Sequence, residues 1–307
     1  MNEMLLPALG DSTLPYLLKG VYSNLAAGSI GRNGQCMALI GNSIYAFSGS
    51  FGSLNTVMEK YDIEANTWSI VTPNNAGPTG RHSPGYCVLN GKLYLFGGST
   101  GTSWGPMSNE AWCFDFATLL WTKLANYPVS LALVSACAIN GKIYLLGGFT
   151  GSGASSPFHE YDPATDTYRT IAHSRSARYG HKAVAVDGKM YLFGGSIGPS
   201  AVSEAWSYDP ATNIWTALKQ MAAGKPHSYV AVIGYLIYIF GGRQGNEPQP
   251  INKLYRYNTQ TGNWTELPSG PTSYYLGGCV ATESAMYLHC SFDMNTNGSF
   301  NFLQKIT

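Results

Sequence analysis

The 307-residue sequence is poor in charge, has no long apolar run and has no closely paired cysteines. Charged residues make up 11% of the chain, against about a quarter in typical soluble domains. The 18 Lys and Arg residues nearly balance the 17 Asp and Glu residues. This balance excludes a basic surface spread over the whole molecule, and we therefore expect no nucleic-acid partner.

The other absences bear on location and on metal chemistry. No apolar run approaches the roughly 18 residues that span a bilayer, so we expect no membrane span. The first seven residues lack the basic start and the longer apolar stretch of a signal peptide. No Cys-x-x-Cys pair occurs, which argues against a zinc site or a disulfide framework. These features predict a cytoplasmic location, with association with a larger particle as an open alternative.

What the sequence does contain is typical of an all-β protein. Apolar residues reach 45% and aromatic residues 13%, enough for a large core and against long disordered regions. The 36 glycines and 21 tyrosines favour turns and strands. No segment shows sustained helical periodicity.

A short apolar strand that carries a tyrosine and ends near a glycine pair recurs along the chain. The clearest copies are Gly91–Gly98, Gly141–Gly148, Gly188–Gly195 and Leu236–Gly242, with degraded copies beginning at Ser43 and Ala285. The six tyrosines are Tyr45, Tyr94, Tyr144, Tyr191, Tyr238 and Tyr287, at spacings of 49, 50, 47, 47 and 49. Length alone favours two domains, but six copies at this period predict one repeat domain.

Each repeat is expected to form four strands. Asn90-Gly91 and its equivalents form the hairpin turn between the first two strands, and a Tyr-Asp and a Trp mark the third and fourth. The last copy lacks its fourth strand, whereas residues 14–22 offer an unpaired strand before the first copy. Pairing the two would close the ring and leave no open edge. We therefore predict a six-bladed β-propeller of four-stranded antiparallel blades over residues 14–307, preceded by a tail at 1–13.

The pattern of a glycine pair, a Tyr-Asp and a later Trp resembles the kelch repeat. Four copies match the glycine pair, and five match the aromatic residues that follow it. The first copy departs at Ser48-Gly49, and the sixth at Cys290-Ser291. The resemblance covers nearly the whole chain and implies the propeller fold, but it says little about function because propellers host many activities.

Basic residues recur at one position of the repeat. The residues sixteen places before the first glycine position are Arg32, Arg81, Leu131, Arg178, Lys225 and Tyr274. The kelch resemblance places them near the channel mouth and implies that arginines of this kind bind acidic peptides. One interpretation is an anion-binding site, since arginine suits carboxylates and phosphates. The other is that these side chains tie blades together through carboxylates or carbonyls.

Further candidates for ligand or partner binding surround this position. His82, His181 and His227 follow it at different offsets, so we expect no metal site. Tyr179, Tyr274 and Tyr275 add aromatic surface. Trp104 lies in one of the variable loops between the second and third strands, where specificity usually resides, and is either a partner contact or a loop anchor.

These features favour a non-catalytic binding module that presents variable loops and a partly basic channel mouth to a protein partner or an anionic ligand. One alternative is a structural or receptor-binding subunit of an assembly such as a virus or phage tail. Another is a sugar-modifying enzyme, since some kelch-like propellers that act on sialic acids use an acid and an arginine. No acid occupies the aligned positions here, and no catalytic motif is present. We assign no catalytic residue, metal or cofactor.

Overall fold

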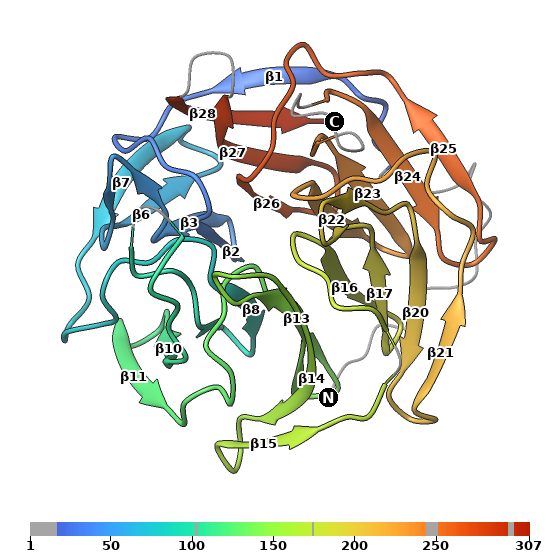
Figure 1. The fold of residues 1–307 in the computed structure, drawn as a ribbon. Coiled ribbons are helices and arrows are strands. Elements are labelled where there is room, and N and C mark those ends of the chain that lie inside the picture. Colours follow the sequence, from blue (N-terminus) through green and yellow to red (C-terminus); the bar gives the residue numbers. More distant parts are fainter. Residues whose placement is uncertain (1–16, 102–103, 174, 244–250, 294–297) are drawn as a thin grey trace.

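Six four-stranded antiparallel sheets are arranged in a ring, as the blades of a propeller (Figure 1). The computed structural model describes residues 17–101, 104–173, 175–243, 251–293 and 298–307. The predicted fold class is confirmed. Among these residues no helix is present that could cross a membrane.

The blades follow one another along the chain, and each begins with its innermost strand. Blade 1 holds β2 (Cys36–Ile40), β3 (Ser43–Phe47), β6 (Met58–Asp62) and β7 (Thr67–Val71). Blade 2 holds β8 (Gly85–Leu89), β9 (Lys92–Phe96), β10 (Ala111–Asp115) and β11 (Leu120–Leu124). Blade 3 holds β12 (Ser135–Ile139), β13 (Lys142–Phe149), β14 (Ala154–Asp162) and β15 (Thr167–Thr170).

The second half of the ring has the same plan. Blade 4 holds β16 (Lys182–Val186), β17 (Lys189–Phe193), β20 (Ala205–Asp209) and β21 (Ile214–Ala217). Blade 5 holds β22 (Tyr229–Ile233), β23 (Leu236–Phe240), β24 (Leu254–Asn258) and β25 (Trp264–Leu267). Blade 6 holds β26 (Gly278–Ala281), β27 (Met286–Asp293), β28 (Gly298–Ile306) and β1 (Tyr22–Leu25). Two small hairpins, β4 (Ser50–Phe51) with β5 (Ser53–Leu54) and β18 (Ser196–Ile197) with β19 (Ser200–Ala201), lie in the loops after the second strands of blades 1 and 4.

An N-terminal strand closes the ring, as the sequence predicts, but it starts later than expected. β1 pairs antiparallel with β28, with Tyr22 opposite Ile306 and Leu25 opposite Leu303. The expected span was 14–22, of which 14–16 lie outside the described residues and 17–21 form no strand. This stretch is nevertheless fixed, because the Lys19 and Val21 amides donate to the Thr307 carbonyl at 3.0 and 2.9 Å.

The core lies between adjacent blades and is built from the recurring aromatic residues. In blade 3, the Tyr161 and Tyr168 rings pack 4.8 Å apart, and Tyr161 also contacts Phe96 of blade 2 at 5.6 Å. Fourth-strand tryptophans reach back to the preceding blade: Trp68 Nε1 donates to the Ala26 carbonyl at 2.7 Å. These contacts explain why the aromatic residues repeat with the blades.

Candidate functional site

One residue from each blade forms a ring of backbone at the channel mouth. We call Gly34, Ser83, Leu133, Gly180, His227 and Leu276 the channel ring. All six have positive φ angles, between 50 and 64°. In five members of the channel ring, the backbone amide donates to the carbonyl of the channel-ring residue of the preceding blade, at 2.7 to 3.1 Å. These donors are Gly34, Ser83, Leu133, His227 and Leu276.

Four members of the channel ring adopt this conformation at a steric cost. Only glycine takes up the left-handed region freely, yet blades 2, 3, 5 and 6 place Ser, Leu, His and Leu there. Such local strain persists where the surrounding structure determines the conformation, and it clusters at functional sites. The ring therefore gives the mouth a fixed outline.

The glycine pairs of blades 2, 3 and 5 fasten each of these blades to the next. The Gly98 amide donates to the Leu131 carbonyl at 2.8 Å, and the Gly148 amide donates to the Arg178 carbonyl at 2.9 Å. A Cβ on Gly97 would lie 2.2 Å from the Leu131 carbonyl oxygen. The glycine pairs are thus required by close approach of the next blade.

The three arginines expected at the mouth are buried and hold glutamates of their own blades. Arg81 Nη2 lies 3.0 Å from Glu110 Oε2, and its Nη1 donates to the Gly97 carbonyl at 3.1 Å. Arg178 makes the same pair of contacts, with Glu204 Oε2 at 2.6 Å and the Gly194 carbonyl at 3.3 Å. The guanidinium groups thus contact a carboxylate and a carbonyl within one blade, rather than joining two blades.

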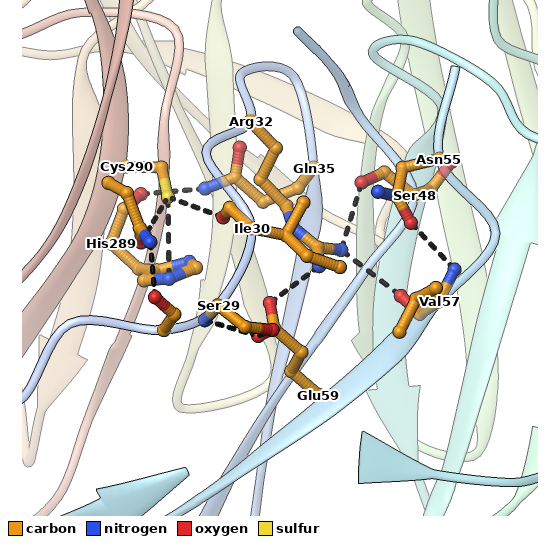
Figure 2. A network of polar contacts seen from close by, with 12 residues as sticks. Ser29, Ile30, Arg32, Gln35, Ser48, Asn55, Val57, Glu59, His289 and Cys290 are labelled. Atoms are coloured by element: carbon orange, nitrogen blue, oxygen red, sulfur yellow. Dashed lines mark hydrogen bonds and ion pairs between the residues drawn. The ribbon is translucent and has the colours of Figure 1, made fainter. Parts of the chain in front are cut away.

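Arg32 lies at the seam between blades 6 and 1, and Figure 2 shows its surroundings. Its Nη2 contacts Glu59 Oε2 at 2.6 Å, and its Nη1 donates to the Ser48 and Val57 carbonyls at 3.2 Å each. Glu59 Oε1 also accepts from the Ser29 hydroxyl and amide at 2.6 and 2.7 Å. Both terminal nitrogens of Arg32 are therefore occupied by contacts within the protein.

The other three residues at this repeat position are buried as well. Lys225 places its ammonium 4.4 Å from the centre of the Tyr255 ring, and burial lowers the pKa of Lys225 to about 8. Leu131 belongs to a core cluster. Tyr274 stacks on Phe302 with ring centres 4.3 Å apart. The six residues thus lie at equivalent places, but their side chains do not form an open basic surface.

The three histidines are buried and differ in their contacts. His82 Nε2 lies 2.5 Å from Asn33 Oδ1, and His181 Nε2 lies 2.9 Å from the Leu146 carbonyl. Burial lowers the pKa of His82 to about 4 and those of His181 and His227 to about 3. All three are therefore neutral at physiological pH. Within the described part of the chain, no group of three potential metal ligands is brought together.

Aromatic rings from five consecutive blades form a continuous line beside the channel ring. We call His82, Trp104, Phe149, Tyr179, His227 and Tyr275 the aromatic arc. Neighbouring ring centres are 4.6, 6.0, 5.3, 6.1 and 6.3 Å apart along this order. These spacings fall within the range of favourable aromatic contacts. The structure thus brings together five of the predicted residues and adds Phe149.

Trp104 is the most exposed member of the arc. Its side chain is 37% exposed, although its ring packs edge-on against both His82 and Phe149. Phe51, in the β4–β5 hairpin of blade 1, is 57% exposed. Trp104 is therefore both anchored in place and available to a partner.

A cavity of about 310 Å³ lies in the channel, bounded by the channel ring and by the innermost strands. His227 lines it and also belongs to the aromatic arc. Its lining includes Lys182, His181 and Gln35, and no Asp or Glu from the part of the chain that the structure describes. Arg32, Arg81 and Arg178 do not line this cavity, so they and their glutamates lie elsewhere than in its wall.

The sequence comparisons agree with this architecture. The family description KLHDC2/KLHL20/DRC7 Kelch-repeats domain matches residues 26–174 and 125–290. Kelch domain-containing protein 10 from Rattus norvegicus is 33% identical over 100 residues, which are 31% of this chain and 24% of that protein. Its Homo sapiens counterpart is 32% identical over 100 residues, 31% of this chain and 22% of that protein. The matches thus span about a quarter of the relatives' length or less. The family match covers most of the chain, and the chain belongs to the kelch-repeat domain family.

Proposed function

We propose that this propeller is a non-catalytic protein-interaction module that binds its partner at the channel mouth. The aromatic arc is the observation that carries the proposal: Trp104 is exposed, Phe149 and Tyr179 are partly exposed, and two buried histidines of the arc pack against them. Aromatic side chains supply much of the binding energy of protein interfaces at a low entropic cost. Here the rings are already packed against one another, so little conformational freedom is left to lose on binding.

The variable loops supply the specificity of the same face. Trp104 and the β4–β5 and β18–β19 hairpins all follow the second strand of a blade. β-bridges join Asn33 to Ser50, His82 to Ser99 and Tyr179 to Ser196, and so hold the loops against the channel mouth. Variable loops on a rigid scaffold are the usual carriers of specificity.

The arginines act indirectly in this proposal. Their side chains contact glutamates at the start of the third strands. The backbone carbonyls of Arg81 and Arg178 also accept hydrogen bonds from glycine amides of the preceding blade. Arg32, Arg81 and Arg178 are therefore positioning residues that keep the mouth in shape. The partner segment best suited to the arc is one with apolar or aromatic side chains, rather than an acidic one.

Affinity purification from the native source, followed by size-exclusion chromatography with light scattering and mass spectrometry, tests the proposal. Trp104→Ala should reduce the amount of the co-eluting partner at least about tenfold, since large interface aromatics commonly contribute more than about 1.4 kcal/mol. Ile70→Ala is the matched control, because Ile70 is 65% exposed on the outermost strand β7. Loss of the partner in Ile70→Ala alone, or a monomer without any partner, would contradict the proposal.

A further inference from the structure

Lys182 interrupts a repeat position that is otherwise uncharged. Lys182 is the first residue of the innermost strand β16 and pairs with Phe193, the last residue of β17. In each other blade, one residue of the innermost strand takes the equivalent place opposite the second strand. Those equivalents are Cys36, Gly85, Ser135, Tyr229 and Gly278. Five of the six blades therefore pack with an uncharged residue at this position, so packing does not require a lysine in blade 4.

The Lys182 side chain lines the channel cavity without a counter-charge. It has no hydrogen-bond or ion-pair partner among the described residues. Burial lowers the pKa of its ammonium below the usual range. Lys182 is only partly buried, so its ammonium stays in contact with the channel and keeps its positive charge there.

The titratable groups that act on Lys182 supply no negative charge. Cys36 and Cys279 lie within its electrostatic reach, but burial raises the pKa of both thiols, that of Cys279 to about 12. His181 and His227 sense the lysine charge and are themselves neutral, with burial as the main cause of their low pKa values of about 3. Among the described lining residues there is no Asp or Glu, so the formal charge that they bring to the cavity is positive.

The cavity also has a second hydrogen-bond donor and a suitable size. Tyr86 also lines it, and its phenol is a hydrogen-bond donor. A volume of about 310 Å³ lies at the lower end of the range for small-molecule sites. A ligand with several oxygens and a negative charge would complement both donors.

We propose that the channel cavity binds a compact oxyanion, a phosphate or a carboxylate of a small molecule, through the Lys182 ammonium. This site adjoins the partner surface of the aromatic arc at His227 but uses a different binding group. It needs no protein partner, so the two proposals can fail independently. Because His227 belongs to both, an occupied cavity would adjoin the bound partner.

The test uses the full chain and three probes: inorganic phosphate, acetate and malonate, each titrated at constant ionic strength. Thermal unfolding and calorimetry should show saturable binding of at least one probe. The variant is Lys182→Met, which keeps most of the side-chain volume without the charge. The control is Lys189→Met, since Lys189 is exposed on β17 of the same blade and pairs with Asp209 at 3.6 Å.

We expect the dissociation constant of the bound probe to rise at least about tenfold in Lys182→Met and to stay unchanged in Lys189→Met. A stabilising shift of the unfolding temperature should accompany binding in the wild type and the control only. Binding of phosphate alone would assign a phosphate site, and binding of acetate or malonate alone a carboxylate site. Equal binding by both variants, or no binding of any probe up to about 10 mM, would overturn the proposal.

Discussion

The Arg32 guanidinium and the Glu59 carboxylate form an ion pair of 2.6 Å in which the two side chains are only 0 and 1% exposed. The pair lies where the last blade meets the first, and Glu59 also accepts two hydrogen bonds from Ser29. Removing one member leaves the other charge buried without compensation. The seam of the ring therefore depends on both residues together.

Glu59→Gln should destabilise the protein by about 3–5 kcal/mol, the usual cost of breaking a buried ion pair from one side. Urea-induced unfolding followed by circular dichroism measures this difference. The control is Glu266→Gln, which removes a carboxylate from the exposed pair with Lys253 and should leave stability nearly unchanged, as is usual for surface pairs. Equal effects of the two substitutions would show that the Arg32–Glu59 pair is not buried in solution.

The glycine pair can be tested by separating backbone strain from close contact. Gly91 and Gly97 have similar φ angles of 69 and 63°, but a Cβ on Gly91 meets nothing within 4 Å, whereas one on Gly97 would lie 2.2 Å from a carbonyl oxygen. Gly91→Ala should cost about 1 kcal/mol from strain alone. Gly97→Ala should cost roughly 3 kcal/mol or more, since the next blade must move. Similar unfolding free energies for the two variants would refute the close approach.

Acid should destabilise the fold through its buried histidines. Burial lowers the pKa of His82 to about 4 and those of His181, His227 and His289 to about 3, against about 6.5 in an unfolded chain. Below pH 6.5 the unfolded state therefore binds more protons, and the free energy of unfolding falls as the pH falls. The stabilisation is complete above pH 6.5 and is lost progressively toward pH 3.

Urea unfolding at pH 7, 6 and 5 measures this effect. Between pH 6.5 and 5, each such histidine should contribute a slope that approaches about 1.4 kcal/mol per pH unit. Carboxyl groups titrate mainly below this window, near pH 4 in the unfolded chain, and the hydrogen bond from Lys123 is the main cause that lowers the pKa of Glu110, to about 2. His181→Gln should reduce the slope. A free energy of unfolding that is constant from pH 7 to 5 would contradict the assigned burial.

Closure by β1 should keep the protein monomeric in the absence of a partner. A chain that lacks residues 1–25 would expose the edge of β28, which pairs with β1 over Leu303–Ile306. We expect a lower unfolding temperature and concentration-dependent self-association, because an open strand edge invites pairing with another chain. Light scattering over a range of protein concentrations detects this. A truncated chain as stable and as monomeric as the intact one would show that β1 does not close the ring.

The fold could be predicted from sequence because each blade carries its own signals. Asn90-Gly91 sets a hairpin turn, and the glycine pair at Gly97 marks where the next blade approaches. The closing strand lies outside the repeat and carries no such signal, so its expected bounds differ from the observed ones. It starts at Tyr22, where the expected span ends.

The candidate site was less predictable, because loop length decides which residue each of its side chains contacts. The arginine-to-glutamate separations are 27, 29 and 26 residues in blades 1, 2 and 4, so a fixed offset finds the arginines but misses their glutamates. The aromatic arc joins residues from different offsets of the repeat, such as Trp104 and His227. Packing of consecutive blades brings neighbouring members of the arc into contact, which no single repeat reveals.

Hydrogen exchange on the purified complex with its co-eluting partner tests the central claim most directly. We expect the partner to slow exchange at Trp104–Ser108, at Phe149–Ala154 and in the β18–β19 hairpin, all beside the aromatic arc. The outermost strands β7, β11 and β21 should exchange as in the free chain. Protection confined to those outer strands, with the mouth unchanged, would contradict a partner site at the channel mouth.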